Sequence, residues 1–163
     1  MKVVVFLGSE SDFEVIQEGL EVLKEFGVPF RLEVSSAHRS PDRTLSLIRE
    51  TEAAGAEVYI AVAGKAAHLA GVVAAHTVRP VIGVPVESAA LAGLDALLST
   101  VQMPKGIPVA TMGLGRMGGT NAALLALQIL SLGDPGLREK LLADRARQAA
   151  RVEAGSAKLR QKL

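Results

Sequence analysis

The heptapeptide SSAHRSP at residues 35–41 places a histidine next to an arginine in a 163-residue chain that has only three histidines. Histidine is the side chain whose unperturbed pKa lies nearest to neutral pH, so His38 can both give and take a proton. The guanidinium of Arg39 presents a fork of N–H donors that fits a phosphate. The pair predicts a site where Arg39 binds an anionic group and His38 faces the rest of the ligand.

The stretch GSESD at residues 8–12 follows an apolar run and precedes a helical pattern. A helix that begins directly after a strand offers free backbone N–H groups and the positive end of its dipole, and both attract an anion. The hydroxyls of Ser9 and Ser11 can donate to phosphate oxygens. The carboxylate of Asp12 repels a phosphate, so it is better suited to a sugar hydroxyl or to capping the helix.

A third loop, AGKAAHLAG at residues 63–71, carries small residues around Lys65 and His68. Small side chains allow the backbone to close over a ring, and a lysine can offset the charge of a carboxylate. An ordinary helix start with a surface lysine explains the same residues equally well.

The stretch GLGRMG at residues 113–118 matches the G-x-G-x-x-G pattern of dinucleotide-binding loops. It follows the fifth predicted strand rather than the first, and no later strand completes a second βαβ unit. The acidic residue about 20 positions beyond it, Asp134, belongs to an Asp-Pro turn. We interpret this stretch as a flexible glycine loop and keep dinucleotide binding as a minor alternative.

Short apolar runs alternate with helical patterns along the whole chain, which predicts one α/β domain with a parallel sheet. Residues 30–34 alternate apolar and charged side chains, which indicates a strand with one solvated face or a strand at an edge, whereas 2–7 and 58–62 are apolar throughout. We therefore expect a three-layer αβα, flavodoxin-like sheet in the order 2-1-3-4-5. The further predicted elements are strands near 80–84 and 108–112, helices near 91–99 and 120–132, and a C-terminal helical tail at about 135–163.

Two helices have readable starts and stops. The first should bury Phe13, Ile16, Leu20 and Leu23 on one face and end at Gly27. The second should begin at Pro41, behind a Ser40 cap, and end before Gly55. Ligands of such sheets bind at the carboxyl ends of the strands, near the point where strand order reverses. The loops at 8–12, 35–40 and 63–69 are therefore expected to form one site.

The composition excludes several classes of protein. Hydrophobic residues make up 49% and charged residues 21% of the chain, and no apolar run is long enough to cross a membrane. The apolar stretch after Lys2 is too short for a signal peptide, so we expect a cytoplasmic protein without a membrane partner. The absence of cysteine excludes disulfides and thiolate chemistry. The three histidines are scattered, so we predict no metal site.

The charges are unevenly distributed along the chain. Residues 135–163 hold eight lysines and arginines against three acidic residues. This basic segment has no aromatic residue for base stacking, so we expect a solvated helix face rather than a nucleic-acid partner. The helix at 120–132 is apolar on nearly every side, which predicts contact with another subunit and hence a homo-oligomer.

Taken in order along the chain, these motifs resemble the PurE family, the N5-carboxyaminoimidazole ribonucleotide mutases of purine biosynthesis. The resemblance extends to about residue 140. It rests on GSESD for the family's G-S-x-S-D, SAHRSP for S-A-H-R-T-P, AGKAAHLAG for A-G-G-A-A-H-L-P-G, and on VIGVPV, GLDALLSTVQMPKGIPVAT and NAALLALQIL.

The resemblance implies a homo-octamer that needs no metal or organic cofactor and acts on a small ribonucleotide. It implies that His38 is the acid/base, that Arg39 and the loop serines bind the phosphate, and that Asp12 binds the ribose hydroxyls. The loop at 63–69 would close over the imidazole and the migrating carboxylate. The full substrate-binding set that it implies is Ser9, Ser11, Asp12, Ser36, Arg39, Gly64, Lys65, His68 and Leu69.

Two residues depart from the family motif: Lys65 stands where the motif has glycine, and Ala70 where it has proline. Both lie in the loop that should handle the carboxylate. Two related activities therefore stay open, a mutase acting on the N-carboxylated ribonucleotide and a carboxylase adding free carbon dioxide to aminoimidazole ribonucleotide. A noncatalytic nucleotide-binding module on the same fold is the alternative from another class.

Overall fold

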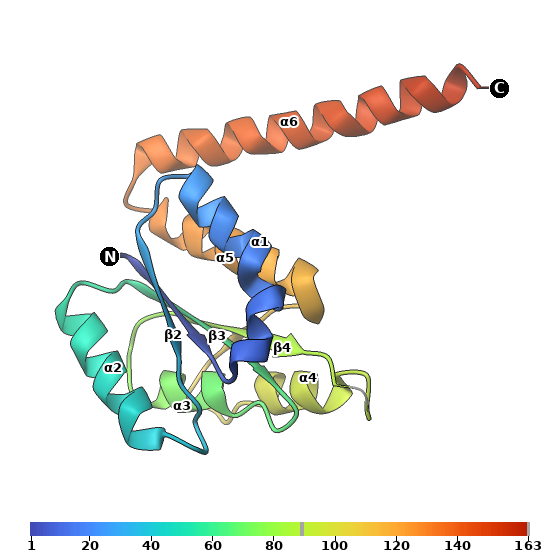
Figure 1. Cartoon of the computed structure of the whole chain (residues 1–163). Coiled ribbons are helices and arrows are strands. Elements are labelled where there is room, and N and C mark those ends of the chain that lie inside the picture. Colours follow the sequence, from blue (N-terminus) through green and yellow to red (C-terminus); the bar gives the residue numbers. More distant parts are fainter. Residues whose placement is uncertain (89, 163) are drawn as a thin grey trace. The chain divides into compact units, whose positions relative to one another are not determined.

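The computed structural model describes residues 1–88 and 90–162 and contains a five-stranded parallel sheet (Figure 1). The strand order is β2-β1-β3-β4-β5, which confirms the predicted topology. Helices α2, α3 and α4 lie on one face of the sheet, and α1 and the start of α5 lie on the other. The strands are β1 (Val3–Leu7), β2 (Phe30–Val34), β3 (Val58–Gly64), β4 (Val81–Val86) and β5 (Ala110–Thr111).

The helices follow the strands in strict alternation through α5, and one long helix comes after them. They are α1 (Phe13–Glu25), preceded by the short 3₁₀ helix η1 (Glu10–Asp12), then α2 (Pro41–Ala53), α3 (Leu69–Ala75), α4 (Leu94–Val101), α5 (Gly115–Leu130) and α6 (Pro135–Arg160). The chain divides into two compact units between Ala126 and Leu127, within α5. That the whole chain acts as one domain stays a prediction.

The buried and edge positions of the strands follow their residue types. Every side chain of β1 is buried, as expected of an apolar strand with neighbours on both sides. The alternating strand β2 is the edge strand and keeps its residues half-buried or exposed. There Arg31 forms ion pairs with Glu33 at 2.7 Å and Glu50 at 2.6 Å, so charged groups cover the open edge.

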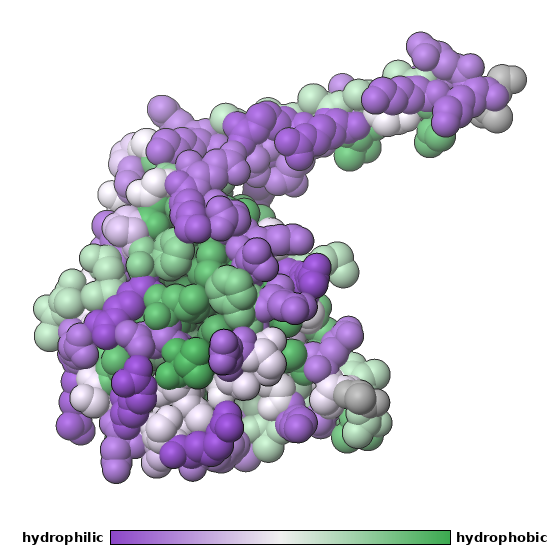
Figure 2. All heavy atoms as spheres, in the orientation of Figure 1, coloured by the Kyte–Doolittle hydropathy of each residue, from purple (hydrophilic) through white to green (hydrophobic). Residues whose placement is uncertain are grey.

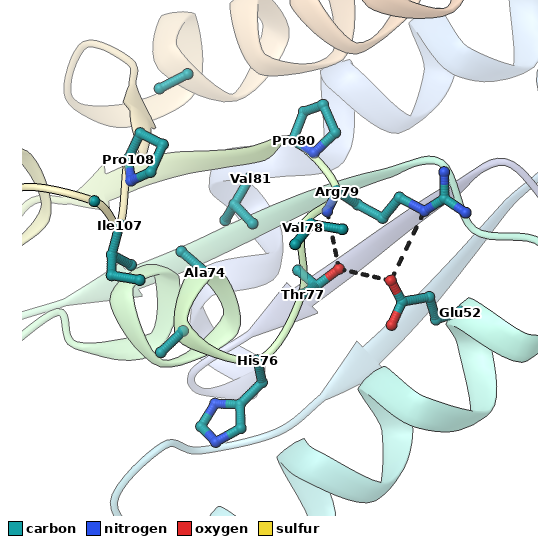
Figure 3. A pocket seen from close by; sticks show the side chains of 13 residues that line it. Glu52, Ala74, His76, Thr77, Val78, Arg79, Pro80, Val81, Ile107 and Pro108 are labelled. Atoms are coloured by element: carbon teal, nitrogen blue, oxygen red, sulfur yellow. Dashed lines mark hydrogen bonds and ion pairs between the residues drawn. The ribbon is translucent and has the colours of Figure 1, made fainter.

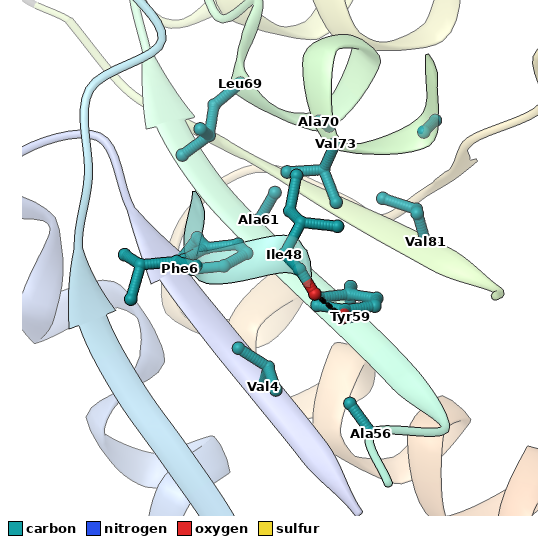
Figure 4. Packing of buried hydrophobic residues seen from close by; sticks show 12 residues of the cluster. Val4, Phe6, Ile48, Ala56, Tyr59, Ala61, Leu69, Ala70, Val73 and Val81 are labelled. Atoms are coloured by element: carbon teal, nitrogen blue, oxygen red, sulfur yellow. Dashed lines mark hydrogen bonds between the residues drawn. The ribbon is translucent and has the colours of Figure 1, made fainter. Parts of the chain in front are cut away.

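The core under α2 and α3 holds the ends of the central strands in place (Figure 4). The rings of Phe6 and Tyr59 stack with their centroids 5.9 Å apart. The Tyr59 hydroxyl donates to the carbonyl oxygen of Ile48 at 3.2 Å and lies 2.9 Å from the hydroxyl of Thr51. The one phenol in this core is therefore satisfied, and α2 is fixed to β3 by polar as well as apolar contacts.

The stretch at 113–118 is not the flexible glycine loop that we expected. Helix α5 begins at Gly115 rather than near 120, so most of the stretch forms its first turn. A Cβ atom on Gly118 would clash with the carbonyl oxygen of Gly113, and one on Gly119 would clash with the backbone of Val15 in α1. Gly118 and Gly119 are therefore needed for close packing of backbones, which a G-x-G-x-x-G pattern alone does not distinguish from ligand binding.

Other differences from the expectations are local. Phe13 is 37% exposed, whereas Ile16, Leu20 and Leu23 are buried as expected. Helix α4 begins at Leu94 instead of 91, and β5 is shorter than predicted. Ser40 does occupy the position before α2, but its hydroxyl does not cap the helix. It donates instead to the carbonyl oxygen of Ser36 at 3.2 Å, which closes the preceding loop on itself.

Helix α6 is long and largely hydrophilic (Figure 2). The carboxylate of Asp134 accepts a hydrogen bond from the backbone N–H of Leu137 at 3.0 Å, and Pro135 occupies the first turn, so the helix has a well-formed start. Almost all of its residues after Leu141 are exposed. The basic C-terminal segment is thus a helix whose surface is largely exposed to solvent.

Candidate active site

Three loops leave the carboxyl ends of three neighbouring strands at one edge of the sheet. Leu7, the last residue of β1, is in register with Val34 of β2 and with Val62 of β3. The backbone N–H of Ser35 donates to the carbonyl oxygen of Leu7 at 2.8 Å, and that of Gly8 to Val62 at 2.9 Å. The loops at 8–12, 35–40 and 65–68 therefore start side by side, with the β1 loop in the middle, as predicted from the strand order, although the third loop is shorter than the predicted 63–69.

The loop after β1 is organised around Asp12. Its Oδ2 accepts a hydrogen bond from the backbone N–H of Ser9 at 2.9 Å, and the residue is only 7% exposed. Burial raises the pKa of the Asp12 carboxyl above its ordinary value of 3.8, although the hydrogen bond from Ser9 and the positive charge of Arg39 act in the opposite direction. The hydroxyl of Ser11 donates to that of Ser9 at 3.1 Å. Both hydroxyls lie near the start of α1, where they could donate hydrogen bonds to a bound anion.

Arg39 reaches from the loop after β2 to the loop after β1. Its Nη2 donates to the carbonyl oxygen of Gly8 at 3.2 Å. The hydroxyl of Ser36 accepts from the backbone N–H of Arg39 at 3.2 Å and from its Nε at 3.5 Å. The hydroxyl of Ser36 thus orients Arg39, a contact that the sequence did not predict.

His38 and His68 meet across the end of β1. Nε2 of His38 lies 2.8 Å from Nδ1 of His68, within hydrogen-bond distance, and the two rings are arranged edge to face at 73°. The hydrogen-bonded atoms lie at an exposed position, so a ligand can reach them. The sequence placed both residues in the site but gave no indication that they contact each other, since 30 positions separate them.

The loop after β3 turns tightly between Gly64 and α3. Backbone hydrogen bonds run from Ala67 to the carbonyl oxygen of Lys65 at 2.9 Å and from His68 to that of Ala66 at 2.7 Å. Lys65 has a φ of 56° and is exposed. A lysine in the left-handed region is unusual and marks a conformation in which glycine is favoured. Leu69, also among the predicted substrate-binding residues, is 2% exposed. Its side chain packs in the hydrophobic core and so anchors the end of the loop.

A large cavity lies at the opposite edge of the sheet (Figure 3). It has a volume of about 920 Å³ and is bounded by the segments that precede β4 and β5 and by the end of α2. Its polar groups satisfy one another: the Thr77 hydroxyl donates to Glu52 at 2.9 Å, and Nε of Arg79 lies 3.8 Å from the same carboxylate. None of the predicted site residues lines this cavity. We therefore place the candidate site at the carboxyl ends of β1, β2 and β3.

The described residues contain no group of three or more histidine, aspartate or glutamate side chains that could hold a metal ion. Among the same residues, no helix is both long and apolar enough to cross a membrane.

Residues 2–151 match the protein family described as AIR carboxylase. The chain belongs to this family. It is 48% identical over 159 residues to the N5-carboxyaminoimidazole ribonucleotide mutase of Methanocaldococcus jannaschii, covering 98% of each chain. It is 50% identical to the mutase of Escherichia coli, covering 86% of this chain and 83% of the relative, and 56% identical to that of Pyrococcus abyssi, covering 86% and 79%.

Two solved structures have the same fold as this chain. The crystal structure of Treponema denticola PurE superposes with a TM-score of 0.87 at 31% sequence identity and covers 96% of this chain and 97% of that one. The crystal structure of a Treponema denticola PurE2 variant gives a TM-score of 0.88 at 30% identity, covering 98% and 99%. These likenesses confirm the family resemblance and the flavodoxin-like fold inferred from the sequence.

Proposed function

We propose that this member of the AIR carboxylase family is an N5-carboxyaminoimidazole ribonucleotide mutase of purine biosynthesis, an isomerase. It would move a carboxylate from the exocyclic nitrogen of the ribonucleotide to ring carbon C4. The proposal is supported by the relatives named above, which carry this name and match the chain over most of their length. The single observation that carries it is that Arg39 contacts the GSESD loop at Gly8, while His38, the next residue, contacts His68 of the loop after β3.

The geometry supports a division of roles in substrate binding. Arg39 and the hydroxyls of Ser9 and Ser11 flank the start of α1, so a phosphate placed there would receive charge-assisted hydrogen bonds. Asp12 would accept a hydrogen bond from a ribose hydroxyl through its carboxylate. A firmly held phosphate fixes the imidazole ring relative to His38, which is what a reaction at two adjacent ring positions needs.

The chemistry needs one proton to leave and one to arrive. Breaking the N–CO₂ bond leaves a nitrogen that must be protonated, and forming the C–CO₂ bond leaves a hydrogen on C4 that must depart. One histidine can supply the first proton and recover it in the second step, so the reaction has no net proton change. His38 is proposed for this role because a ligand can reach it and it stands beside the anion-binding Arg39.

The carbon dioxide formed between the two steps must stay in the site. Ala66 and Ala67 make the loop after β3 small, and the tight turn at 65–68 brings its backbone close to the strand end. Closure of this loop over the imidazole would keep carbon dioxide next to C4. No cofactor is part of the proposed mechanism.

A second candidate is direct carboxylation of aminoimidazole ribonucleotide by carbon dioxide. Lys65 favours it, because an exposed ammonium in the carboxylate-handling loop replaces the glycine of the family motif. A positive charge there could hold bicarbonate or an arriving carboxylate. The noncatalytic nucleotide-binding module stays the alternative from another class.

Assays of the purified protein with each ribonucleotide, with and without bicarbonate, separate these candidates. The mutase proposal predicts turnover of the N-carboxylated ribonucleotide that does not depend on bicarbonate. Turnover of aminoimidazole ribonucleotide only when bicarbonate is present would select the carboxylase. Turnover of neither substrate, together with binding of either, would support the noncatalytic module. The variant Lys65→Gly restores the family residue, and under the carboxylase candidate it should lower the bicarbonate-dependent rate.

The quaternary state and location complete the proposal. We propose a homo-octamer in the cytoplasm, with a small ribonucleotide and neither nucleic acid nor a membrane as partner. Exposed large apolar side chains support a subunit interface on and before α4 rather than on α5, whose apolar residues at 122–130 are buried or half-buried. The exposed row is Leu91, Leu94, Leu98 and Val101. Sedimentation as a monomer at micromolar concentration would contradict an octamer.

A further inference from the structure

The contact between His38 and His68 restricts where the protons of both rings can be. An imidazole has two ring nitrogens, and in the neutral ring one donates and the other accepts. The 2.8 Å contact uses Nε2 of His38 and Nδ1 of His68. The nitrogens that remain are Nδ1 of His38 and Nε2 of His68, and neither takes part in a hydrogen bond with the described residues.

Two arrangements fit this contact when both rings are neutral. In the first, Nδ1–H of His68 donates to Nε2 of His38, and His38 carries its own proton on Nδ1. In the second, Nε2–H of His38 donates to Nδ1 of His68, and Nδ1 of His38 is bare. Only the second survives protonation of His38, because an imidazolium is a donor at both nitrogens and would face the Nδ1–H of His68 in the first arrangement.

We propose that His68 is a positioning residue whose Nδ1 accepts a hydrogen bond from Nε2 of His38 throughout the reaction. Nδ1 of His38 is then the nitrogen that exchanges the proton with the substrate. This inference rests on the proposed function. His38 enters the reaction as an imidazolium, protonated at both nitrogens. It gives its Nδ1 proton to the exocyclic nitrogen as the N–CO₂ bond breaks, and the Nδ1 left bare takes the proton from C4 after the C–CO₂ bond forms, which restores the imidazolium.

His68 suits this task because a neutral acceptor orients its partner without adding charge. A carboxylate in its place would also fix the ring, but it would favour the protonated form of His38 and weaken it as an acid. The surrounding loops already supply charges of both signs. The charged residues of the loops and helix starts around His38 are Glu10, Asp12, Arg39, Asp42, Arg43 and Lys65.

The assignment can be tested without substrate by nitrogen NMR of protein labelled with ¹⁵N-histidine, at a pH where the rings are neutral. We expect the Nε2–H tautomer for both His38 and His68. His76 serves as an internal reference, because its Nδ1 lies 2.8 Å from the carbonyl oxygen of Val72 and must therefore donate. An Nδ1–H tautomer for His68 would overturn the inference, whatever the activity of the protein.

Kinetics of two variants test the functional consequence. An asparagine at position 68 can place its amide oxygen near the position of Nδ1, so His68→Asn should keep most of kcat. His68→Leu removes the acceptor and should lower kcat by about 10- to 100-fold, as loss of an orienting partner of a histidine typically does, with little change in KM. Equal kcat for His68→Leu and the unchanged protein, or equal losses in both variants, would overturn the inference.

The pH profile gives a readout that a purely structural role would not change. His68→Asp places a carboxylate opposite Nε2 of His38, and this negative charge favours protonated His38. The midpoint at which kcat changes because His38 loses its proton should therefore move to higher pH. An unshifted profile in an active His68→Asp protein would contradict the contact. If the unchanged protein turns over neither ribonucleotide, the proposed function fails, whereas the tautomer measurement still decides the role of His68.

Discussion

Nη2 of Arg39 lies 3.2 Å from the carbonyl oxygen of Gly8, so a side chain that follows β2 reaches the loop that follows β1. The guanidinium thus lies next to the loop that leads into α1, where we propose that the phosphate binds. The same crossing of the β1 loop brings His38 of the β2 loop to His68 of the β3 loop. The site is therefore assembled over the carboxyl end of β1, between the loops that follow β2 and β3.

Replacing Arg39 by alanine should weaken substrate binding more than it slows the reaction. Loss of charge-assisted hydrogen bonds to a phosphate costs about 1.5–3 kcal/mol each, so KM should rise roughly 10- to 100-fold. Arg39→Lys keeps the positive charge but loses the forked donor geometry, so its KM should lie between those of the unchanged protein and Arg39→Ala. Arg43→Ala is the control, because Arg43 pairs with Glu33 of the edge strand at 2.8 Å and should leave KM unchanged. Equal effects of Arg39→Ala and Arg43→Ala would contradict phosphate binding by Arg39.

Replacing His38 by asparagine should abolish turnover while the ribonucleotide still binds. Removal of the acid/base group should lower kcat by about 10²- to 10⁴-fold, and calorimetry should give a similar dissociation constant for the product. His76→Asn is the matched control, since His76 lies at the opposite edge of the sheet. Full activity of His38→Asn would remove His38 from the proposed chemistry.

The buried carboxyl of Asp12 makes the stability of the free protein depend on pH. Its pKa is raised in the folded state, mainly by burial, above the ordinary value of 3.8. The folded protein therefore binds more protons than the unfolded chain between those two pKa values, and this contribution to stability falls as the pH rises through that window. Asp12→Asn keeps an acceptor for the N–H of Ser9 and removes the buried charge. Its melting temperature should exceed that of the unchanged protein at neutral pH, with the difference shrinking below pH of about 4.

Ser11→Asn is a useful control for that comparison, because Ser11 is exposed and carries no charge. Its effect on the melting temperature should not vary with pH. A difference between Asp12→Asn and the unchanged protein that grows on acidification would reverse the sign and contradict the raised pKa of Asp12.

The backbone at Lys65 predicts a gain in stability on substitution. A non-glycine residue in the left-handed region costs about 1–2 kcal/mol. Lys65→Gly removes this cost, but the flexibility of glycine in the unfolded chain offsets part of the gain. The free energy of unfolding should rise by up to about 1 kcal/mol, measured as a higher denaturant midpoint. Lys65→Asn should also stabilise, because asparagine tolerates this region. Lys105→Gly, at an exposed position without positive φ, should destabilise. The same sign for both glycine variants would contradict strain at Lys65.

The sequence predicted the sheet well because its strands differ in kind. Apolar runs such as 58–62 indicated strands buried on both faces, and the alternating residues 30–34 indicated a solvated face or an edge position. With residues 30–34 at the edge, the order 2-1-3-4-5 fitted best, and the structure has this order. Helix starts were less reliable. Glycines near 113–118 suggested a loop, yet they serve backbone contacts between elements distant in sequence, such as Gly119 against Val15. Local patterns carry no information on such contacts.

The candidate site was predictable as a set of loops but not as a set of contacts. The positions of His38, Arg39 and the GSESD loop follow from strand order. The pairing of His38 with His68 depends on how far each loop reaches across the end of β1, and no residue pattern encodes that distance. The hydroxyl of Ser36 likewise turned out to hold Arg39 in the free protein. The site roles themselves stay predictions until they are measured.

The most direct test of the account follows the carboxylate itself. The N-carboxylated ribonucleotide, labelled with ¹³C in its carboxylate, is converted by the protein in the presence of excess unlabelled bicarbonate, and the product is examined by ¹³C NMR. Because carbon dioxide should stay in the site between the two steps, we predict that the label appears undiluted in the carboxylate on C4. Dilution of the label to the level of the bicarbonate pool would contradict the proposed mutase.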